Sequence, residues 1–271
     1  MLDHPQNDIF IHMDAKNKLY NPSETLKLVK FSNVYHTPRI KVTWGGYSQI
    51  ETELILLEAA TTNGHYEHYH LISGSDLPIK KQEDIIAFFE VNHGLEFISF
   101  QSNSFGRDDR VKERVKYYYP FQEKIGRGTF ILRAFRKIMI MLQKIIRVSR
   151  NRGVKFQYGA NWFSITDEFA RYVLKHKEQI QKMFSNTLCC DEIFIHTLLV
   201  NSDFRNNLYH KEFDDDIAKG AMRFIDWERG SPYTFKIEDL ESIRQSEAMF
   251  ARKFDENVDA EIIREIQKLY S

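Results

Sequence analysis

Short apolar runs that suit β-strands alternate with amphipathic helical stretches along this chain, and this alternation constrains its fold more than any other feature. The runs at residues 8–12, 69–72 and 97–100 have the length and composition of buried strands. This order predicts an α/β fold with a mixed, mostly parallel sheet that is flanked by helices. At 271 residues, 42% of them hydrophobic, the chain is long enough to form a single domain over residues 1–271.

Capping residues mark where several helices begin. Asn21 followed by Pro22 predicts a helix start, because proline is tolerated at the first helical position. Ser48 and Glu51 have the spacing of a capping box, so the next helix is predicted to begin at Ser48. Further helices are predicted at residues 85–91, 167–184, 191–200, 238–250 and 259–270.

Residues 127–155 form a basic amphipathic segment that differs from its surroundings, and we interpret it as a helical insertion. Its apolar residues fall on one helical stripe with arginine and lysine around it. Such a helix can make peripheral contact with an anionic membrane through residues 130–150, with about 1 kcal/mol of attraction for each basic residue. It can equally pack on its own domain with a solvated basic face. Both interpretations stay open.

The overall charge limits the classes of partner. The 38 basic and 38 acidic side chains cancel, so no overall field attracts nucleic acid, and an anionic ligand needs a local basic cluster. The two cysteines, Cys189 and Cys190, are neighbours and too close for a normal disulfide, which favours reduced, buried thiols. We find no signal peptide and no long apolar span, and therefore expect a cytoplasmic protein that can reach the inner membrane face through residues 130–150.

Two carboxylates, Asp191 and Glu192, open an otherwise apolar helix. The unpaired N–H groups and the positive end of the helix dipole are a sufficient structural reason for either acid. A carboxylate at such a position is also a candidate catalytic base.

Seven motifs, taken in order, resemble the core-2/I-branching enzymes, glycosyltransferase family 14, which also contains the peptide O-xylosyltransferases. The first three are IFIHMDAK at residues 9–16, WGGYS at 44–48 and YHLISGSDLPIK at 69–80. The others are GANWF at 159–163, FIHTLLVNS at 194–202, IDW at 225–227 and FARKF at 250–254. The WGG turn and the HTL run are closer to the xylosyltransferase branch than to the mucin-type branching enzymes.

The resemblance implies a GT-A-like fold that uses a UDP-sugar, inverts the anomeric carbon and needs no metal or other cofactor. It implies transfer of xylose or N-acetylglucosamine to a glycan or peptide hydroxyl, with lipid-linked acceptors included. Glu192 then occupies the position of the general base, which removes the proton of the acceptor hydroxyl. Asp191 caps the helix, orients Glu192 or contacts the acceptor. His196, one turn later, either bonds Glu192 or fills an interface.

The same resemblance implies how the departing diphosphate is neutralised. Many GT-A enzymes hold a divalent ion with an Asp-x-Asp motif at a strand end, but here the strand ends in SGSD with the single acid Asp76. The basic pair Arg252 and Lys253 then replaces the ion, carried by C-terminal helices within residues 236–271. The alternative is a solvated helix end, where cations are favoured without any ligand.

Other residues at matching positions are assigned to the donor and the acceptor. The predicted donor site contains Asp14, Lys16, Trp44, Gly45, Asp76 and Arg229 beside the basic pair. The alternative for Asp14 is a residue of a turn at a strand end, and the alternative for Trp44 is a tight turn with a core tryptophan. Trp162 and Trp227 either stack on donor or acceptor or are packed in the core. His65, His68 and His70 lack a fourth ligand, and Asp214 to Asp216 lie in a polar turn, so we predict no metal site.

One departure from the family supports a rival hypothesis. Family members begin with a strand and helix upstream of the first motif, whereas this sequence opens at Met1 close to that motif. Either the recorded start lies downstream of the true one, or the protein lacks this strand and its sheet is expected to expose unpaired backbone. The rival is a protein that keeps the fold but binds a glycan or a partner without turnover.

Overall fold

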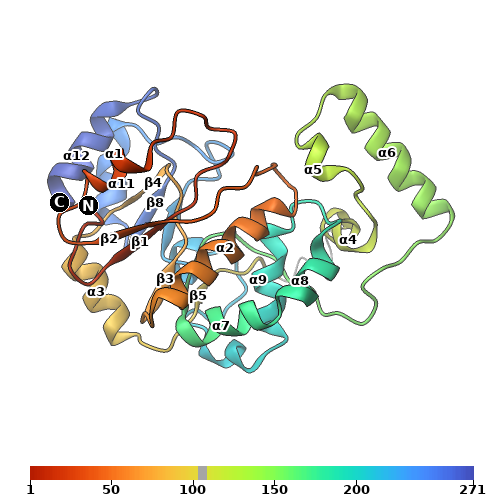
Figure 1. Ribbon diagram of the computed structural model, residues 1–271, viewed down its shortest axis with the longest axis horizontal. Helices are drawn as coiled ribbons and strands as arrows, with labels where there is room; N and C mark the ends of the chain where they lie inside the picture. The colour runs from red at the N-terminus through yellow and green to blue at the C-terminus, as the bar shows by residue number, and fades with distance from the viewer. Residues whose placement is uncertain (103–108) are drawn as a thin grey trace.

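The computed structural model describes residues 1–102 and 109–271, and its strands form three small sheets (Figure 1). In the first sheet β1 is parallel to β2, and in the second β6 lies between β3 and β5 and is antiparallel to both. In the third, β8 is antiparallel to β4 and parallel to β7. The strands are β1 Asp8–Ile11, β2 Asn33–His36, β3 His68–His70, β4 Asp76–Pro78, β5 Phe97–Ile98, β6 Phe163–Thr166, β7 Arg223–Ile225 and β8 Phe250–Arg252.

Helices cover these sheets on both sides (Figure 1). α2, α7, α8 and α9 gather around the second sheet, α11 and α12 lie beside the third, and α5 and α6 project from the body. Their bounds are α1 Pro22–Leu26, α2 Ser48–Asn63, α3 Gln82–Val91, α4 Asp109–Lys116, α5 Gln122–Ile125, α6 Phe130–Ile145, α7 Asp167–Lys175, α8 Lys177–Phe184, α9 Asp191–Val200, α10 Ile217–Gly220, α11 Leu240–Gln245 and α12 Ala260–Tyr270, with 3₁₀ turns at Asp203–Asn207 and Ile237–Asp239.

The mixed α/β class with helices on its sheets is confirmed, but the expectation of a mostly parallel sheet is wrong. Among the described strands, three of the five pairings are antiparallel. A parallel pair needs a crossover that returns the chain to the same end of the sheet. The alternation of strands and helices in a sequence does not show whether a connection does this.

The two helix starts predicted from capping residues are right, although one of the caps is not. Asn21 caps α1 by accepting a hydrogen bond from the N–H of Ser23. α2 begins at Ser48, but the capping box is absent, because the Ser48 hydroxyl instead accepts from the Thr43 N–H at 2.8 Å. The Ser48 N–H donates to Glu123 of α5, also at 2.8 Å. A hydrogen bond to Glu123, which is distant in the sequence, thus replaces the predicted capping box between Ser48 and Glu51.

Two C-terminal elements differ from the prediction. The helix expected at 167–184 is divided into α7 and α8 at His176. The helix expected at 238–250 ends at Gln245, and residues 250–252 form β8. The apolar run before and within β8 is buried, and a short buried run has no periodicity that separates strand from helix. Arg252 therefore lies on a strand, and the C-terminal helices do not carry the basic pair.

α9 passes through the main hydrophobic core. Nine of its ten residues are buried, and Glu192 is the exception, with 41% of its side chain exposed. The core around α9 is built from α2, β6, α7 and α8. Of the two acidic residues that open α9, Glu192 is therefore the one whose side chain remains accessible to a ligand.

A cavity of about 310 Å³ lies between β1 and β3, and α2 and α3 also contribute to its lining. Within the described residues β1 pairs with β2 alone and β3 with β6 alone, so both strands present an unpaired edge. This agrees with the expectation of unpaired backbone in the sheet. Such edges are places where another extended chain can add.

Candidate active site

A glycine turn at residues 44–46 anchors one side of the site. Gly45 has a φ of +70°, which favours glycine, and its carbonyl accepts from the Cys189 N–H at 3.0 Å. Its own N–H donates to the Gln49 side chain, whose Nε2 donates to Asp191 Oδ2 at 2.8 Å. The predicted donor turn is thereby joined to the start of α9.

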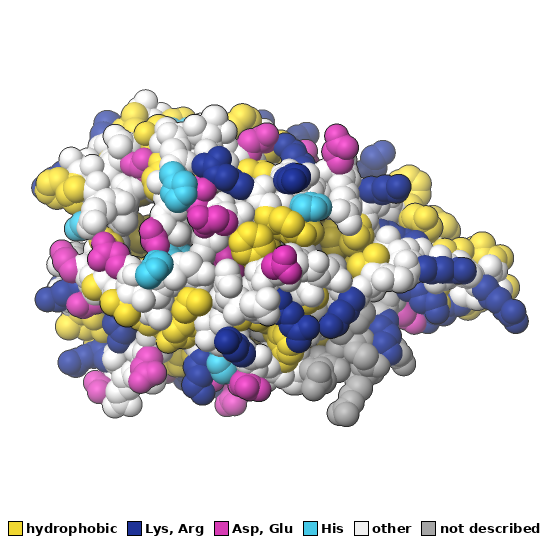
Figure 2. Space-filling view, turned by 90° about the horizontal axis from the view of Figure 1, so that it is seen from below, with side chains coloured by type: hydrophobic (Ala, Val, Ile, Leu, Met, Phe, Trp, Pro, Cys, Tyr) yellow, Lys and Arg dark blue, Asp and Glu magenta, His cyan; other side chains and the backbone are white. Residues whose placement is uncertain are grey.

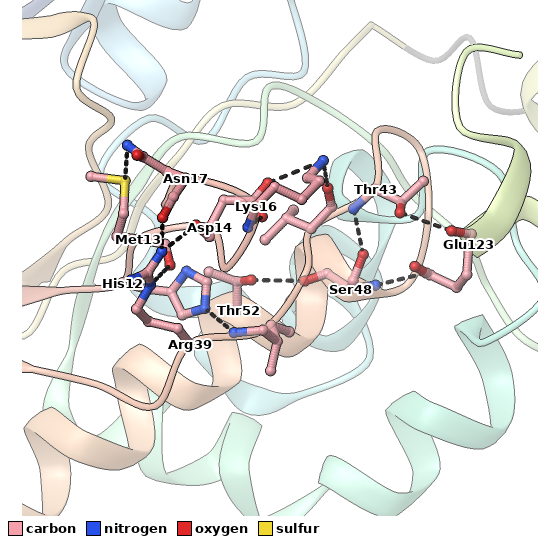
Figure 3. Close-up of polar contacts among 12 residues, drawn as sticks. His12, Met13, Asp14, Lys16, Asn17, Arg39, Thr43, Ser48, Thr52 and Glu123 are labelled. Carbon is pink, nitrogen blue, oxygen red and sulfur yellow. Dashed lines mark hydrogen bonds and ion pairs between the residues drawn. The ribbon is translucent and has the colours of Figure 1, made fainter. Parts of the chain in front are cut away.

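Asp14 and Lys16 lie beside the same turn (Figure 3). The Lys16 ammonium donates to the carbonyl of Val42 at 2.6 Å and pairs with Asp14 at 3.1 Å. Burial opposes the Asp14 charge, but the N–H of Lys16 and its ammonium hold the pKa of this carboxyl below its usual value. Lys16 thus contacts the segment that leads into the glycine turn.

Glu192 is held by an arginine that the sequence analysis missed. Arg114 of α4 donates to Glu192 Oε2 at 2.6 Å. Burial alone would lower the pKa of Arg114, yet the negative charge of Glu192 raises it above the usual value. The ion pair holds the Glu192 carboxylate in place at the start of α9. Nothing in the local sequence distinguishes Arg114 from the other basic residues around it.

Asp191, unlike Glu192, is buried in the protein. Its side chain is buried and accepts from Gln49, while Asp191 Oδ1 has no hydrogen-bond partner within the described residues. Burial, followed by the charge of Glu192, raises the pKa of Asp191 to about 7. The acceptor contact predicted for Asp191 has no support in this geometry; its side chain instead joins α9 to α2.

The buried carboxyl group of Asp191 makes stability depend on pH. A carboxyl group whose folded pKa is raised stabilises the fold at low pH, and this contribution is lost as pH rises from its unfolded pKa through about 7. We therefore expect the Asp191→Asn variant to gain about 2–4 kcal/mol relative to the parent between pH 5 and pH 8, at roughly 1.4 kcal/mol per pKa unit. Urea unfolding at both pH values measures this. Parallel pH profiles for the two proteins would contradict it.

His196 fills an interface. It is fully buried, packs edge-on against Phe100 at 5.3 Å between ring centroids, and has a pKa lowered to about 3 by burial. Gly159 lies against it, because a Cβ there would stand 2.7 Å from His196 Nε2 and 2.1 Å from the carbonyl oxygen of Ser99. The Gly159 N–H donates to the carbonyl of Glu192 at 3.1 Å, which fixes the segment 159–162 on α9.

Trp162, at the end of this segment, meets the predicted diphosphate site. The Arg252 guanidinium lies 4.5 Å from the centroid of its ring. Arg252 is paired with Asp76 across β4 and β8, and its Nη1 donates to Asp76 Oδ1 at 2.9 Å and to Ser73 Oγ at 2.5 Å. Only 20% of the Arg252 side chain is exposed, so the alternative of a solvated helix end is wrong. Lys253 follows directly and is half-buried.

A second arginine, Arg223, interacts with Asp76. Arg223 is 1% exposed and donates to the carbonyls of Ala221 at 2.8 Å and Phe163 at 3.0 Å, while its guanidinium lies 4.2 Å from the centroid of the Phe250 ring. Burial lowers the pKa of Arg223 to about 9, and the charge of Asp76 partly opposes this shift. Asp76 thus interacts electrostatically with two arginines. The sequence analysis did not single out Arg223, because a buried arginine has no pattern of its own.

Not every predicted residue joins this cluster. Arg229 is engaged with Asp226 at 2.5 Å and Asp239 at 2.7 Å, and it stacks on Tyr233. None of these three partners belongs to the predicted donor site. Trp227 is 52% exposed on the loop before Arg229. Successive contacts and neighbouring residues connect seven of the predicted residues, namely Asp14, Lys16, Trp44, Glu192, Trp162, Asp76 and Arg252. Arg229 and Trp227 are not connected to this set.

The candidate metal ligands are used in other ways. His68 is buried, and His70 Nδ1 is 2.7 Å from the hydroxyl of Ser164. Asp216 caps α10 by accepting from the Lys219 N–H. Over residues 1–102 and 109–271, the structure contains no group of three or more histidine, cysteine or acidic side chains suited to a metal ion.

Comparison with known proteins agrees with the seven motifs. Residues 1–247 match the family model described as Branch: Core-2/I-Branching enzyme, a match that ends before β8. Xylosyltransferase 2 of Rattus norvegicus is 26% identical over 278 residues, which cover 96% of this chain and 30% of that protein. Xylosyltransferase 1 of Homo sapiens is 26% identical over 281 residues, which cover 97% of this chain and 27% of that protein. The chain therefore spans less than a third of the length of these relatives.

Proposed function

Since this chain belongs to the core-2/I-branching enzyme family, we propose that it transfers a sugar from a UDP-sugar to a hydroxyl of a glycan or peptide, with inversion and without a metal ion. The observation that carries the proposal is the position of Glu192. It is the one residue of α9 that is not buried, and contacts through Gly159 and Trp162 connect it to Arg252. The names of the relatives favour xylose as the sugar, with N-acetylglucosamine as the second candidate.

Glu192 is the proposed general base. Inversion is a single displacement, so one carboxylate must remove the acceptor proton while UDP leaves from the opposite face. Arg114 occupies Glu192 Oε2, and Oε1 is the oxygen that we assign to the acceptor hydroxyl. As the hydroxyl oxygen bonds to the anomeric carbon, its proton passes to Glu192 and the bond to the diphosphate breaks.

Fixed cations are proposed to stabilise the leaving diphosphate. Asp76 and Ser73 hold the Arg252 guanidinium in place, and Lys253 adds a second positive charge at the end of β8. Arg223 contributes a third positive charge, against the single negative charge of Asp76. Such preorganised charges act where negative charge develops and need no reorganisation during the reaction. The uridine side of the donor is assigned to Asp14, Lys16 and the glycine turn with Trp44.

A UDP-release assay tests the role of Arg252. We expect release with UDP-xylose or UDP-N-acetylglucosamine to continue in EDTA, and the Arg252→Ala variant to lower kcat by about 10²–10³-fold, as loss of one charge-stabilising donor does. The control is Arg205→Ala, an exposed arginine that stacks on Phe213. Activity that EDTA abolishes and Mg²⁺ or Mn²⁺ restores would contradict metal independence. An equal loss in both variants would contradict the role of Arg252.

The rival function, sugar binding without turnover, has one observation in its favour. β1 leads to Asp14, yet its edge and that of β3 are unpaired beside the 310 Å³ cavity. A loosely held β1 would weaken donor binding. A folded protein that binds UDP but releases none from a panel of UDP-sugars would favour this function over transfer.

A further inference from the structure

α6 presents an apolar face that the rest of the protein does not cover. On an ideal helix, its apolar residues fill about half of the circumference. Gln143 is the one residue of α6 that is buried. Figure 2 shows hydrophobic side chains gathered with basic ones at the projecting end of the molecule. The most exposed apolar side chains are Phe130 79%, Ile131 77%, Ile138 54%, Met141 58%, Ile145 65% and Ile146 71%.

The opposite, polar face attaches α6 to the body. Gln143 exchanges two hydrogen bonds of 2.8 Å with the backbone of Tyr118. Arg136 donates to the Gln122 side chain at 3.1 Å, and Lys144 pairs with Glu113. The prediction of an amphipathic helix is therefore confirmed, but its alternative of an apolar face packed on its own domain is wrong.

The charge around this helix has one sign. Residues 127–155 contain nine basic residues and no acidic one, in a chain whose 38 basic and 38 acidic side chains cancel overall. Such a segment is complementary to anionic lipid headgroups, with its apolar face in the acyl boundary. A second copy of this chain on the same face would bring two strongly basic segments together. The exposed members of the set are Arg127, Arg133, Lys137, Lys144, Arg147, Arg152 and Lys155.

The length of α6 suits a helix that lies in the surface of a membrane. Sixteen residues extend over about 24 Å, which is less than the ~30 Å of a bilayer core. Across the described parts of the chain, no helix has the length and apolar character to span a bilayer.

α5 couples α6 to the candidate active site. Gln122 receives a hydrogen bond from Arg136 and donates to the Trp44 carbonyl at 3.1 Å. The Thr43 hydroxyl donates to the Glu123 carbonyl at 2.8 Å (Figure 3). Arg127 lies 5.2 Å from the centroid of the Trp44 ring. A surface bound by α6 is therefore a short distance from the donor turn.

We propose that α6 docks this protein on an anionic membrane and presents the active site to an acceptor carried on a lipid. The inference rests on the proposed transferase function for the nature of the acceptor, but the docking itself rests on α6 alone. The apolar side chains of α6 insert into the membrane, and the basic residues around them give the preference for anionic lipid.

Flotation with vesicles tests the docking without any activity. We expect the full chain to float with phosphatidylcholine vesicles that contain phosphatidylglycerol, and at least tenfold less with phosphatidylcholine alone. A triple variant, Ile131→Ser, Ile138→Ser and Ile145→Ser, is expected to lose flotation at least tenfold, because it removes the inserted side chains. UDP release from a water-soluble acceptor should be unchanged in this variant, since none of the three residues contacts the candidate site.

The matched control is Leu28→Ser with Val91→Ser, which removes two exposed apolar side chains, 78% and 80% accessible, elsewhere on the surface. This control should float like the parent. Flotation of the triple variant at the parent level, or no flotation of the parent, overturns the proposal. The proposal is also overturned if light scattering shows that the parent is a dimer and the triple variant a monomer. The apolar face of α6 would then bind a second copy of this chain. Flotation without UDP release would leave the docking intact and overturn the transferase function.

Discussion

Glu192→Gln is expected to lower kcat for sugar transfer by about 10²–10⁴-fold, the usual contribution of a general base. Glutamine keeps the size of the side chain but cannot take up the acceptor proton. It also leaves Arg114 without its carboxylate partner, which is 2.6 Å away in the parent. Because Glu192 is not buried, the substitution should have little effect on the packing of α9.

Initial rates of UDP release with saturating donor and acceptor measure this effect. The control is Glu58→Gln, an exposed carboxylate that pairs with Lys177 on the surface. Its rate should remain within twofold of the parent. If Glu192→Gln transfers sugar at the parental rate while its circular dichroism spectrum is unchanged, another group must be the base.

Arg223→Met is expected to lower the free energy of unfolding by about 3–5 kcal/mol, the typical cost of removing one partner from a buried charged network. The parent side chain donates to carbonyls from β6 and from the residues before β7, and it stacks on Phe250 of β8. Methionine fills similar space but has no donor, so these buried carbonyls lose their partner. Arg223 thus joins the second sheet to the third.

Urea unfolding of the parent and of both variants tests this, with Arg244→Met as the control. Arg244 is exposed and pairs with Glu241 at 3.6 Å, so its loss should change the free energy of unfolding by less than about 0.5 kcal/mol. A destabilisation by Arg223→Met that is no larger than that of the control would show that the two sheets are held together by apolar packing alone.

Local patterns were sufficient to predict several elements. α9 has the predicted bounds, because two acids favour its first turn and a mostly apolar run follows. The start of α2 at Ser48 was predicted from a capping box that does not form; the bond from its N–H to Glu123, 75 residues away in the sequence, stabilises that start instead. The position of a helix end can thus be right when the predicted reason for it is wrong.

Contacts between distant residues account for what could not be predicted. Periodicity does not separate β8 from a helix, so the basic pair was assigned to the wrong kind of element. Arg114 meets Glu192 across 78 residues of sequence, and Arg223 meets Phe163 across 60. For residues 127–155 the sequence left two interpretations, and the exposure of the apolar face decides against packing on the domain.

The contrast between α9 and α6 has a consequence for how relatives of this chain can diverge. Nine of ten positions in α9 are constrained by neighbours on every side, so substitutions there are removed by selection for a folded protein. α6 contributes one buried residue, and its sequence can drift, lengthen or disappear with little effect on the interior. Homologues that act in different places should therefore agree in α9 and differ most in the projecting segment.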